Sequence, residues 1–518
     1  MCGILFSTNR YLSQKCFQNA LELMDHRGPD SKKIINIDNV MLGHTRLNVL
    51  DLDKRSDQPL YSNNGRYVVI FNGEIYNYKE LARKYSINQR TNGDTELLIE
   101  LYIKLGSRML SELNGMFAFL IYDIKNNNTF VARDRLGVKP LYYSYYKGDF
   151  YLASEVASLL YMINDNSIDR LGIRQYRKLR SFFNGRTMYK HIKSFPSGFY
   201  MFNNKLTQYW KLLQGSQEAP DPEELYDLLD TSIKYRCISD VPVGSYLSGG
   251  LDSSLITSMS GVKHSWTVGF ESCNEFNWSK KASSLIGTQH NETIINFEEF
   301  KKTAKWMINK RKEPLSVPNE VLLYEMTKEV RKKNTVVLSG EGADELYFGY
   351  DKIFKYFSQN EFEVSAFDKL YSYGTNNDNE IIDDVLEPFI SSGLSGLELV
   401  AHFFQVAHLQ GLLRRLDNST MLCSVEARVP FTDYRLVERL AGVDFNHRIT
   451  NGCAKYPLKQ LAKKMGILSD DIIYRKKIGF PVPLDRIFSN TLSGTGENMD
   501  NWLDFNLATL GVPFEKEY

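Results

Sequence analysis

The segment Ser248–Ser254 (SGGLDSS) constrains the fold of this chain more than any other. It follows an apolar run, Val241–Leu247, whose length predicts a buried strand, and it precedes apolar residues at helical spacing, Leu255, Ile256 and Met259. Its adjacent glycines let the backbone come close to a ligand, and the N–H groups and dipole of a helix N-terminus favour anions. The segment therefore predicts a strand, a tight turn and a helix start that together hold phosphate.

This phosphate loop is not of the Walker type, because it lacks the lysine of that motif. Asp252 instead places a carboxylate beside the expected phosphates, where a bound Mg²⁺ ion would need one. We therefore expect the loop to bind a phosphate compound together with Mg²⁺.

Composition limits the classes of partner. The 518 residues predict about two to four domains, and 63 basic residues against 62 acidic ones give a net charge of +1. A nucleic-acid partner is not expected, because such partners need clustered basic charge. No membrane span is expected either, since the chain has no apolar run of about 18 residues. Scattered cysteines without a C-x-x-C pair, and an N-terminus unlike a signal peptide, predict a cytoplasmic protein.

Short strands separated by turn-forming residues dominate the first 210 residues. The predicted strands are Tyr67–Phe71, Gly115–Tyr122, Thr129–Arg133, Leu141–Tyr145 and Phe150–Ala153, and helical spacing appears at Cys16–Met24 and Thr95–Leu105. This pattern predicts a mostly antiparallel sheet system with helices packed on it.

The pattern changes after a polar, proline-containing stretch, Gln214–Pro222, which predicts a linker. Beyond it, predicted strands at Val243–Leu247, Ser265–Val268, Thr293–Asn296 and Val336–Leu338 alternate with predicted helices at Ser253–Met259, Trp278–Ile286, Phe297–Ile308 and Glu320–Lys332. This alternation is typical of a parallel sheet with right-handed crossovers, and the residues after about 385 look largely helical. We therefore place one domain at 2–212, the linker at 213–222 and a second domain at 223–518, with no role assigned to the last 25 residues.

A series of short motifs carries a resemblance to one enzyme family. The first half holds Met1–Ile4, His26–Asp30, Arg46–Leu47, Phe71–Asn77, Gly93–Glu96 and Arg133–Pro140, and the second half adds the phosphate loop, Ser339–Glu345, Glu426–Phe431 and Arg475–Phe480. In these motifs, from Cys2 to about Pro483, the chain resembles the glutamine-dependent asparagine synthetases. The resemblance implies an α+β N-terminal-nucleophile (αββα) glutaminase domain, followed by an α/β parallel-sheet ATP-pyrophosphatase synthetase domain.

Cys2 is the predicted nucleophile of the glutaminase half. Removal of Met1 would leave a thiol and a free α-amine on one residue, and an α-amine with a pKa of about 7.7–8.0 is a base near neutral pH. It would take the thiol proton, so that the thiolate attacks a carboxamide, forms a thioester and releases ammonia. Outside this context, Cys2 would be an incidental buried thiol.

The resemblance also supplies the oxyanion and substrate contacts. Asn72 and Gly73 resemble the family's oxyanion donors, in a loop after the strand Tyr67–Phe71, although an isolated Asn-Gly pair would indicate a hairpin turn. Arg46 is expected to bind the α-carboxylate of glutamine, and Glu74 and Asp94 its ammonium group. The backbone contacts implied by the resemblance come from Leu47, Asn48, Val49 and Leu50. The alternative for Asp94 is a helix N-cap.

The resemblance places Mg-ATP on the phosphate loop. The ATP contacts it implies are Leu247, Ser248, Gly249, Gly250, Asp252, Ser253, Val268, Ser339 and Gly340. Leu247 and Val268 are expected at strand ends, where ligands bind in open parallel sheets. Asp252 and Asp344 are the candidate Mg²⁺ ligands, and helix N-terminal charge is the alternative for Asp344.

The reaction implied by the resemblance is the amidation of L-aspartate to L-asparagine. Cleavage between the α- and β-phosphates would place AMP on the side-chain carboxylate and release pyrophosphate, and ammonia would then displace AMP. Glu341 matches the position associated with forming the acyl-adenylate. Lys455 resembles the lysine that stabilises the developing charge, although alone it would be a solvated residue. Because neutral water protonates ammonia, we expect a protected path near the domain interface, with Arg27 and helices around Met421–Arg428 among its walls.

Two other functions stay open. Lys312 stands where family members often carry an acid, and Cys423 and Ala427 lie in a segment where members differ, so the sequence constrains the acceptor less than the reaction. The first alternative is an amidotransferase for another carboxylate, in polysaccharide or secondary-metabolite synthesis. The second is a glutaminase or regulator with a degenerate nucleotide-binding module. The expected partners are glutamine, aspartate and ATP, and the family precedent suggests a homodimer.

Overall fold

The computed structural model of the protein describes residues 2–214, 218–372, 377–394, 396–450, 452–475, 482–488 and 498–512. Three residues of the predicted linker, 215–217, lie outside these ranges, as do residues 476–480 of the Arg475–Phe480 motif and part of the last 25 residues.

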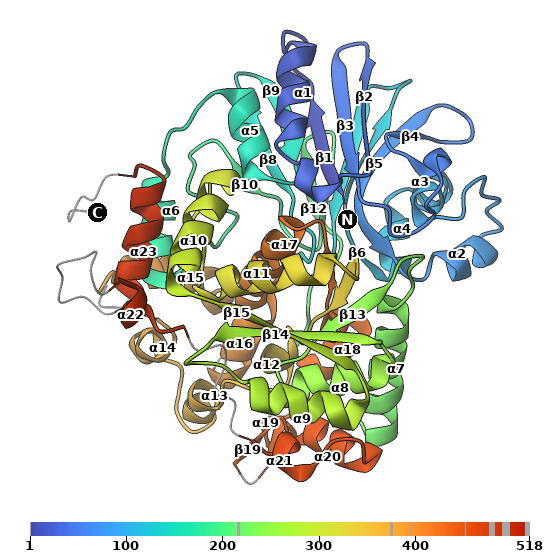
Figure 1. The fold of residues 1–518 in the computed structure, drawn as a ribbon. Coiled ribbons are helices and arrows are strands. Elements are labelled where there is room, and N and C mark those ends of the chain that lie inside the picture. Colours follow the sequence, from blue (N-terminus) through green and yellow to red (C-terminus); the bar gives the residue numbers. More distant parts are fainter. Residues whose placement is uncertain are drawn as a thin grey trace.

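Two antiparallel sheets make up the first part of the described chain (Figure 1). The first has the order β10-β8-β9-β1-β3-β2, with β1 Gly3–Ser7, β2 Ser31–Ile37, β3 Val40–Arg46, β8 Tyr142–Tyr146, β9 Asp149–Ala153 and β10 Lys193–Ser194. The second has the order β12-β11-β7-β6-β5-β4, with β4 Leu60–Tyr61, β5 Tyr67–Ile75, β6 Gly115–Asp123, β7 Asn128–Arg133, β11 Phe199–Phe202 and β12 Lys205–Gln208. The predicted antiparallel sheet system is therefore confirmed.

These sheets pack face to face between two layers of helices (Figure 1). Alternate residues such as Ile4 and Phe6 of β1 meet Val68 and Ile70 of β5 in the core between the sheets. The helices of this part are α1 Gln14–Glu22, α2 Tyr78–Lys84, α3 Asp94–Leu105, α4 Met109–Glu112, α5 Val156–Ile163 and α6 Arg170–Leu179. Helices α1 and α5 cover the first sheet, and α3 covers β5 of the second.

A five-stranded parallel sheet follows, in the order β15-β14-β13-β16-β17. Its strands are β13 Val243–Tyr246, β14 His264–Phe270, β15 Gln289–Ile295, β16 Val336–Leu338 and β17 Glu426–Arg428. The helices before and between them are α7 Pro222–Arg236, α8 Leu251–Ser260, α9 Phe276–Ile286, α10 Phe297–Arg311 and α11 Asn319–Arg331. The predicted parallel sheet is confirmed.

Three details of the sequence prediction need correction. The strand predicted at Thr293–Asn296 begins at Gln289 instead, because β15 is an edge strand whose first residues are polar. Helix α8 begins two residues earlier than predicted, which brings Asp252 into its first turn. Residues 426–428 were predicted to belong to helices that line the ammonia path, but they form the short strand β17.

The remaining described segments are mostly helical. They are α12 Ala343–Leu346, α13 Asp351–Phe357, α14 Val364–Tyr371, α15 Asn379–Ile390, α16 Gly396–Phe403, α17 Leu409–Met421, α18 Tyr434–Ala441, α19 Phe445–Arg448, α20 Tyr456–Met465, α21 Asp470–Ile473, α22 Leu484–Phe488 and α23 Asn498–Thr509, with a small hairpin of β18 Ile449–Thr450 and β19 Cys453–Ala454. A π-helical turn, Phe404–His408, joins α16 to α17. In the part of the chain that the structure describes, no helix combines the length and the apolar character needed to cross a bilayer.

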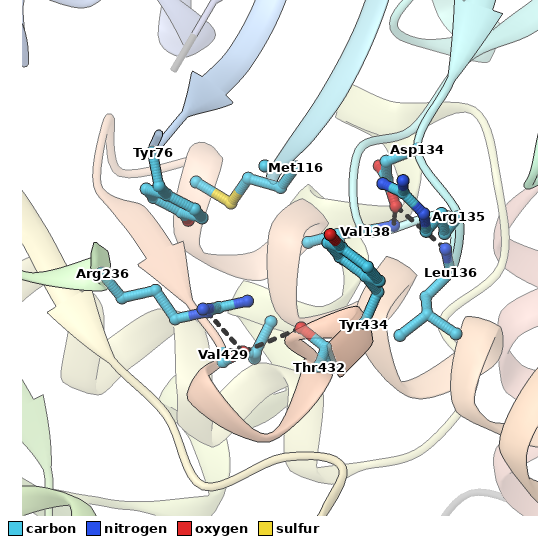
Figure 2. Close-up of a pocket in the computed structure, with 11 residues that line it drawn as sticks. Tyr76, Met116, Asp134, Arg135, Leu136, Val138, Arg236, Val429, Thr432 and Tyr434 are labelled. Atoms are coloured by element: carbon cyan, nitrogen blue, oxygen red, sulfur yellow. Dashed lines mark hydrogen bonds between the residues drawn. The ribbon is translucent and has the colours of Figure 1, made fainter. Parts of the chain in front are cut away.

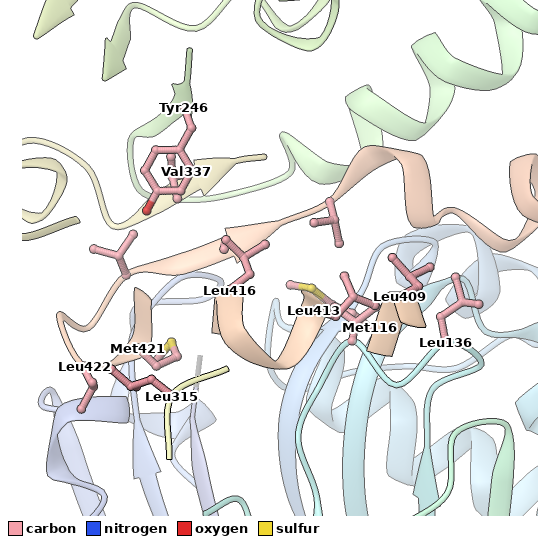
Figure 3. Close-up of a cluster of buried hydrophobic side chains, with 14 of the residues drawn as sticks. Met116, Leu136, Tyr246, Leu315, Val337, Leu409, Leu413, Leu416, Met421 and Leu422 are labelled. Atoms are coloured by element: carbon pink, nitrogen blue, oxygen red, sulfur yellow. The ribbon is translucent and has the colours of Figure 1, made fainter. Parts of the chain in front are cut away.

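Helix α17 lies where the two halves of the protein meet. Figure 3 shows Leu409 and Leu413 of α17 near Met116 of the first half, and Leu416 on the same helix, in one cluster with Tyr246 and Val337 of the parallel sheet. All of these side chains belong to one continuous apolar core. Burial of this core holds the two halves together and excludes water from much of the interface.

Candidate active sites

Cys2 lies directly before β1, which pairs with the strand that ends at Arg46. Its side chain is buried, with 8% of the residue surface exposed. Burial raises the pKa of the Cys2 thiol, while the backbone N–H of Leu47 and the charge of Arg46 lower it. Because burial dominates, the thiol needs a nearby base to become a nucleophile.

Asn72 lies beside Cys2. Its side-chain oxygen accepts a hydrogen bond from the Cys2 nitrogen at 3.1 Å. Its side-chain nitrogen is fully buried and donates to no group in the described part of the chain. A buried N–H group without a partner is costly, so this nitrogen is suited to a ligand oxygen.

Gly73 follows in the same strand, not in a loop. Residues 72 and 73 pair with Ala118 and Phe117 of β6, and β5 continues to Ile75. The predicted loop and the hairpin alternative are therefore both wrong. Gly73 has φ +152°, and a Cβ at this position would lie 2.0 Å from the Met116 carbonyl oxygen. Only glycine fits here, and it leaves the backbone beside Asn72 open.

Arg46, predicted to bind a carboxylate, holds the loop that follows β3. Its guanidinium donates to the carbonyl of Asp53 at 2.9 Å, to Asp57 at 2.7 Å and to the carbonyls of Leu50 and Asp51. A substrate carboxylate would therefore share N–H groups that already position the loop.

The loop residues Leu47 and Val49 are buried, and the N–H of Asn48 donates to Asp30 at 2.7 Å. The carbonyl of Val49 accepts from the N–H of Asp240 at 2.9 Å, which ties this loop to the second half of the chain.

Glu74 and Asp94 form a buried acidic pair. Asp94 accepts from the N–H of Ile75 at 2.8 Å, and burial raises its pKa to about 6. Burial, and then the charge of Asp94, raise the pKa of Glu74 well above its usual value. Two carboxylates in this environment would be stabilised by a cation such as an α-ammonium group. The N-cap of α3 is Gly93, so the N-cap alternative for Asp94 is wrong.

Arg428 was not predicted as a functional residue. Its guanidinium lies 3.4 Å from Glu74 and 2.5 Å from Glu426, with no exposed surface. Its backbone carbonyl accepts the N–H of Ser339 at 2.9 Å. One residue therefore contacts the acidic pair of the first site and the Ser339–Gly340 segment of the second. The Glu426–Phe431 motif was its sequence signal.

Arg27 lies between the halves, as predicted. It donates to the carbonyl of Cys2 at 3.1 Å, to Glu155 at 3.1 Å and to Asp417 of α17 at 2.9 Å. Lys139 is 3.4 Å from the same Asp417 carboxylate. Asp417 is nearly fully buried and was missed by the sequence analysis.

A cavity of about 310 Å³, including its open part, lies nearby at the same interface. Figure 2 shows Tyr76, Met116 and Leu136 of the first half facing Arg236 and Tyr434 of the second. The cavity lies outside both sets of predicted site residues.

The phosphate loop has the predicted form. Strand β13 ends at Tyr246, and Gly250 is the N-cap of α8. Gly249 has φ +71°, and a Cβ there would lie 2.4 Å from the Trp278 carbonyl carbon. The Ser248 hydroxyl accepts from the Gly250 N–H at 3.3 Å, so the turn is organised by the protein itself. The α8 N-terminus is thus available to an anion.

The two strand-end predictions differ in outcome. Leu247 follows β13 directly, and its N–H donates to the carbonyl of Trp266 at 2.8 Å. Val268 lies inside β14, two residues before its end at Phe270, so its predicted place at a strand end is wrong. The strand continues because its pairing with β15 extends to Phe270.

Lys455 brings the two candidate metal ligands together. Its ammonium lies 2.6 Å from Asp252 and 2.5 Å from Asp344. Lys455 is only 7% exposed, so the solvated-lysine alternative is wrong. A Cβ on Gly349 would lie 1.8 Å from the Asp344 carboxylate, which makes this unpredicted glycine necessary for the arrangement. Asp344 lies in the first turn of α12, where a carboxylate interacts favourably with the helix N-terminus. It also forms an ion pair with Lys455, so its position is not explained by the helix end alone.

The Ser339–Glu341 segment follows β16 and faces the phosphate loop. A Cβ on Gly340 would lie 3.3 Å from the Asp252 Cβ, so the two segments touch. Glu341 pairs with Arg415 of α17 at 3.1 Å. Arg415 had no motif signal in the sequence. The second site thus combines a phosphate loop, a Lys–Asp–Asp cluster and a carboxylate.

Asp252 and Asp344 fit a Mg²⁺ ion that arrives with a phosphate ligand. One Asp252 oxygen, Oδ1, is buried and has no hydrogen-bond partner in the described ranges. The same ranges contain no group of three or more side chains suited to a resident metal. Mg²⁺ in nucleotide sites is commonly held by one or two carboxylates and by substrate phosphates.

Comparison with known proteins matches each half of the chain to a family model. The glutamine amidotransferase domain model matches residues 1–210, and the asparagine synthase model matches residues 224–501. Asparagine synthetase (glutamine-hydrolyzing) 1 of Bacillus subtilis is 31% identical and covers 95% of this chain and 89% of its own. Asparagine synthetase B of Escherichia coli is 28% identical, and the match covers 81% of this chain and 71% of the relative. The asparagine synthetase of Cricetulus griseus is 28% identical, and the match covers 93% of this chain and 84% of the relative. The chain belongs to the family of glutamine-hydrolysing asparagine synthetases.

Proposed function

We propose that this protein converts L-aspartate to L-asparagine, using L-glutamine as the nitrogen source and ATP as the energy source. The products are asparagine, glutamate, AMP and pyrophosphate. The observation that carries the proposal is that residues from distant segments assemble into two separate sites within one chain. Cys2 and Asn72 meet in one, and Asp252, Lys455 and Asp344 meet in the other.

The glutaminase reaction uses Cys2 after removal of Met1. The freed α-amine stays hydrogen-bonded to the Asn72 oxygen and accepts the thiol proton, and the thiolate attacks the glutamine carboxamide. The unpartnered Asn72 nitrogen and the Gly73 N–H stabilise the resulting oxyanion. Glu74 and Asp94 bind the α-ammonium group. Arg46 and the backbone of Leu47–Leu50 bind the α-carboxylate.

The synthetase reaction uses the phosphate loop and the Lys455 cluster. ATP lies on Leu247–Ser253 with Val268, Ser339 and Gly340, and its reacting phosphates face the ammonium of Lys455. Asp252 and Asp344 would hold a Mg²⁺ ion, which neutralises phosphate charge when bound. The aspartate carboxylate displaces pyrophosphate from ATP to form β-aspartyl-AMP, and Glu341 assists this step. Ammonia from the first site then displaces AMP.

Several finer assignments accompany this function. We assign residues 2–212 to an N-terminal-nucleophile domain and residues 223–518 to an ATP-pyrophosphatase domain, joined by a linker at 213–222. The helix–sheet–sheet–helix layers support the first assignment, and the parallel sheet with its phosphate loop supports the second. A homodimer and a cytoplasmic location stay predictions.

One assay tests the function. The protein is incubated with glutamine, Mg-ATP and aspartate, and pyrophosphate, glutamate and asparagine are measured. We expect pyrophosphate and asparagine in equal amounts, both dependent on aspartate. Pyrophosphate release that does not depend on aspartate would point to another acceptor. If glutamate is released but ATP is not cleaved with any acceptor tested, the proposal that the protein is a ligase is refuted.

A further inference from the structure

Asp240 lies in the segment that joins α7 to β13, and it contacts the loop after β3. Its N–H donates to the carbonyl of Val49 at 2.9 Å, and its carboxylate accepts the N–H of Asp51 at 2.8 Å. These two hydrogen bonds hold a residue of the second half against two residues of the first. The loop that they hold includes Leu47–Leu50, whose backbone is proposed to bind the α-carboxylate of glutamine.

The backbone of Asp51 is in the left-handed region, with φ +48°. This conformation is unfavourable for a residue with a side chain and persists where surrounding groups hold it. The carbonyl of Asp51 accepts from Arg46, which belongs to the first half, and its N–H donates to Asp240, which belongs to the second. Both halves of the chain therefore fix this turn.

The side chain of Asp51 extends this support to the other side of the proposed glutamine site. Its Oδ2 accepts the N–H of Asn92 and the hydroxyl of Ser56, each at 2.7 Å. Asn92 precedes Asp94, the proposed ammonium ligand, by two positions. Asp51 thus links the loop that would bind the α-carboxylate of glutamine to the segment that carries Asp94.

The segment that carries Asp240 is itself held in place. Arg428 donates to the carbonyl of Arg236 at 2.9 Å and to the carbonyl of Ile238 at 2.6 Å. The side chain of Ile238 packs against the apolar core between α3 and the second antiparallel sheet. Asp240 therefore has a defined position from which it holds the loop after β3.

We propose that Asp240 is a positioning residue of the glutamine site, supplied by the half of the chain that uses the ammonia. It does not bind glutamine itself. It holds Asp51, and through Asp51 the groups that bind the two charged ends of the amino-acid part of glutamine. Three residues after Asp240 the chain enters β13, the strand that leads to the phosphate loop, so one short segment supports both sites. The assignment rests on the proposed function and adds a residue of the second half to the glutamine site.

The test measures glutamine hydrolysis by the full-length protein over a range of glutamine concentrations. Asp240→Ala removes the acceptor of the Asp51 N–H, so we expect KM for glutamine to rise about 5- to 12-fold, as the loss of one hydrogen bond predicts. The value of kcat should stay within about twofold, because Cys2 and Asn72 are unchanged. Asp240→Asn keeps an oxygen acceptor at the same place and should keep KM within about twofold of normal.

Asp230→Ala is the matched control, because Asp230 is also an acidic residue of the second half but pairs with Lys234 within α7, at 2.7 Å. It should leave KM for glutamine unchanged. Circular dichroism and asparagine formation with added ammonia report that each variant is folded. If Asp240→Ala does not fold, Asp240→Ser takes its place, because the serine oxygen is one bond closer to the backbone than the carboxylate oxygens of Asp240.

Amide hydrogen exchange gives an independent measurement of the loop itself, without glutamine present. Peptides that cover residues 47–57 should exchange faster in Asp240→Ala than in the unaltered protein. The same peptides should exchange at the normal rate in Asp240→Asn and Asp230→Ala. Equal exchange of these peptides in Asp240→Ala and the unaltered protein would contradict the positioning role.

The two proposals fail in different ways. If the unaltered protein does not hydrolyse glutamine, the proposed function is wrong, and the assignment of Asp240 falls with it. If hydrolysis by the unaltered protein is normal but folded Asp240→Ala has the same KM, only the role of Asp240 is wrong. The same conclusion follows if Asp240→Asn is as impaired as Asp240→Ala, because the hydrogen bond would then not be the cause.

Discussion

Asn72→Ala should separate glutamine use from synthesis. The substitution removes the buried side-chain nitrogen that has no partner and the oxygen that accepts from the Cys2 nitrogen at 3.1 Å. Loss of one oxyanion donor lowers kcat by about 10²- to 10³-fold, or about 2.7–4 kcal/mol. The lost hydrogen bond to Cys2 adds about 0.5–1.5 kcal/mol, a further factor of about 2 to 12. Glutamine hydrolysis should therefore fall by at least about 200-fold.

The assay follows glutamate release from glutamine and, separately, asparagine formation with added ammonia. The ammonia reaction bypasses Cys2 and should keep its rate. Asn77→Ala is the control, because its amide also makes two hydrogen bonds, to Glu112 and Asn114, but none to Cys2. It should retain glutamine hydrolysis. Hydrolysis within about fivefold of normal in folded Asn72→Ala, or an equal loss of the ammonia reaction, would refute the oxyanion role.

Three further predictions concern the two sites. The pKa of Asp94 is raised to about 6, so this carboxylate, which we propose binds the ammonium group of glutamine, is protonated as pH falls through 6. KM for glutamine should therefore rise there, and an unchanged KM between pH 7 and 5 would contradict this. Lys455→Met should lower aspartate-dependent pyrophosphate release by at least about 100-fold and leave glutaminase activity intact, which parallel assays would show. Gly349→Ala places a Cβ 1.8 Å from the Asp344 carboxylate, so Mg-ATP turnover should fall while glutamine hydrolysis continues; equal losses in both assays would indicate misfolding instead.

Local patterns predicted much of this fold. The Ser248–Ser254 loop was predictable because its glycines, strand and helix are contiguous, although Gly250 is the N-cap and the helix begins two residues earlier than predicted. Asn72 and Gly73 were wrongly predicted to lie in a loop, because their position depends on a partner that is distant in the sequence. An Asn-Gly pair is a strong local turn signal, yet pairing with Ala118 and Phe117 keeps it inside a strand. Tertiary pairing outweighed local preference at that point.

The residues that sequence reasoning missed act through distant partners. Arg27 and Asp417 are 390 positions apart in the chain. Arg415 meets Glu341 across 74 positions, and no spacing rule links them. Strand β17 is three residues long, too short for a periodic pattern, and exists because it pairs with β16. These features follow from how segments pack, which a single sequence shows only through its motifs.

The charged groups at the interface are explained better by what they position than by stability. Arg27, Lys139 and Arg428 are almost fully buried there, each near carboxylates. Removing such charges from water is costly, and apolar residues of similar volume often stabilise a protein at least as well. An apolar core around α17 already joins the halves. Apolar side chains could not form the hydrogen bond from Arg27 to the Cys2 carbonyl, nor the contact of Arg428 with Glu74. Arg27, which also donates to Asp417, connects Cys2 to the second half, and Arg428 connects Glu74 to it directly.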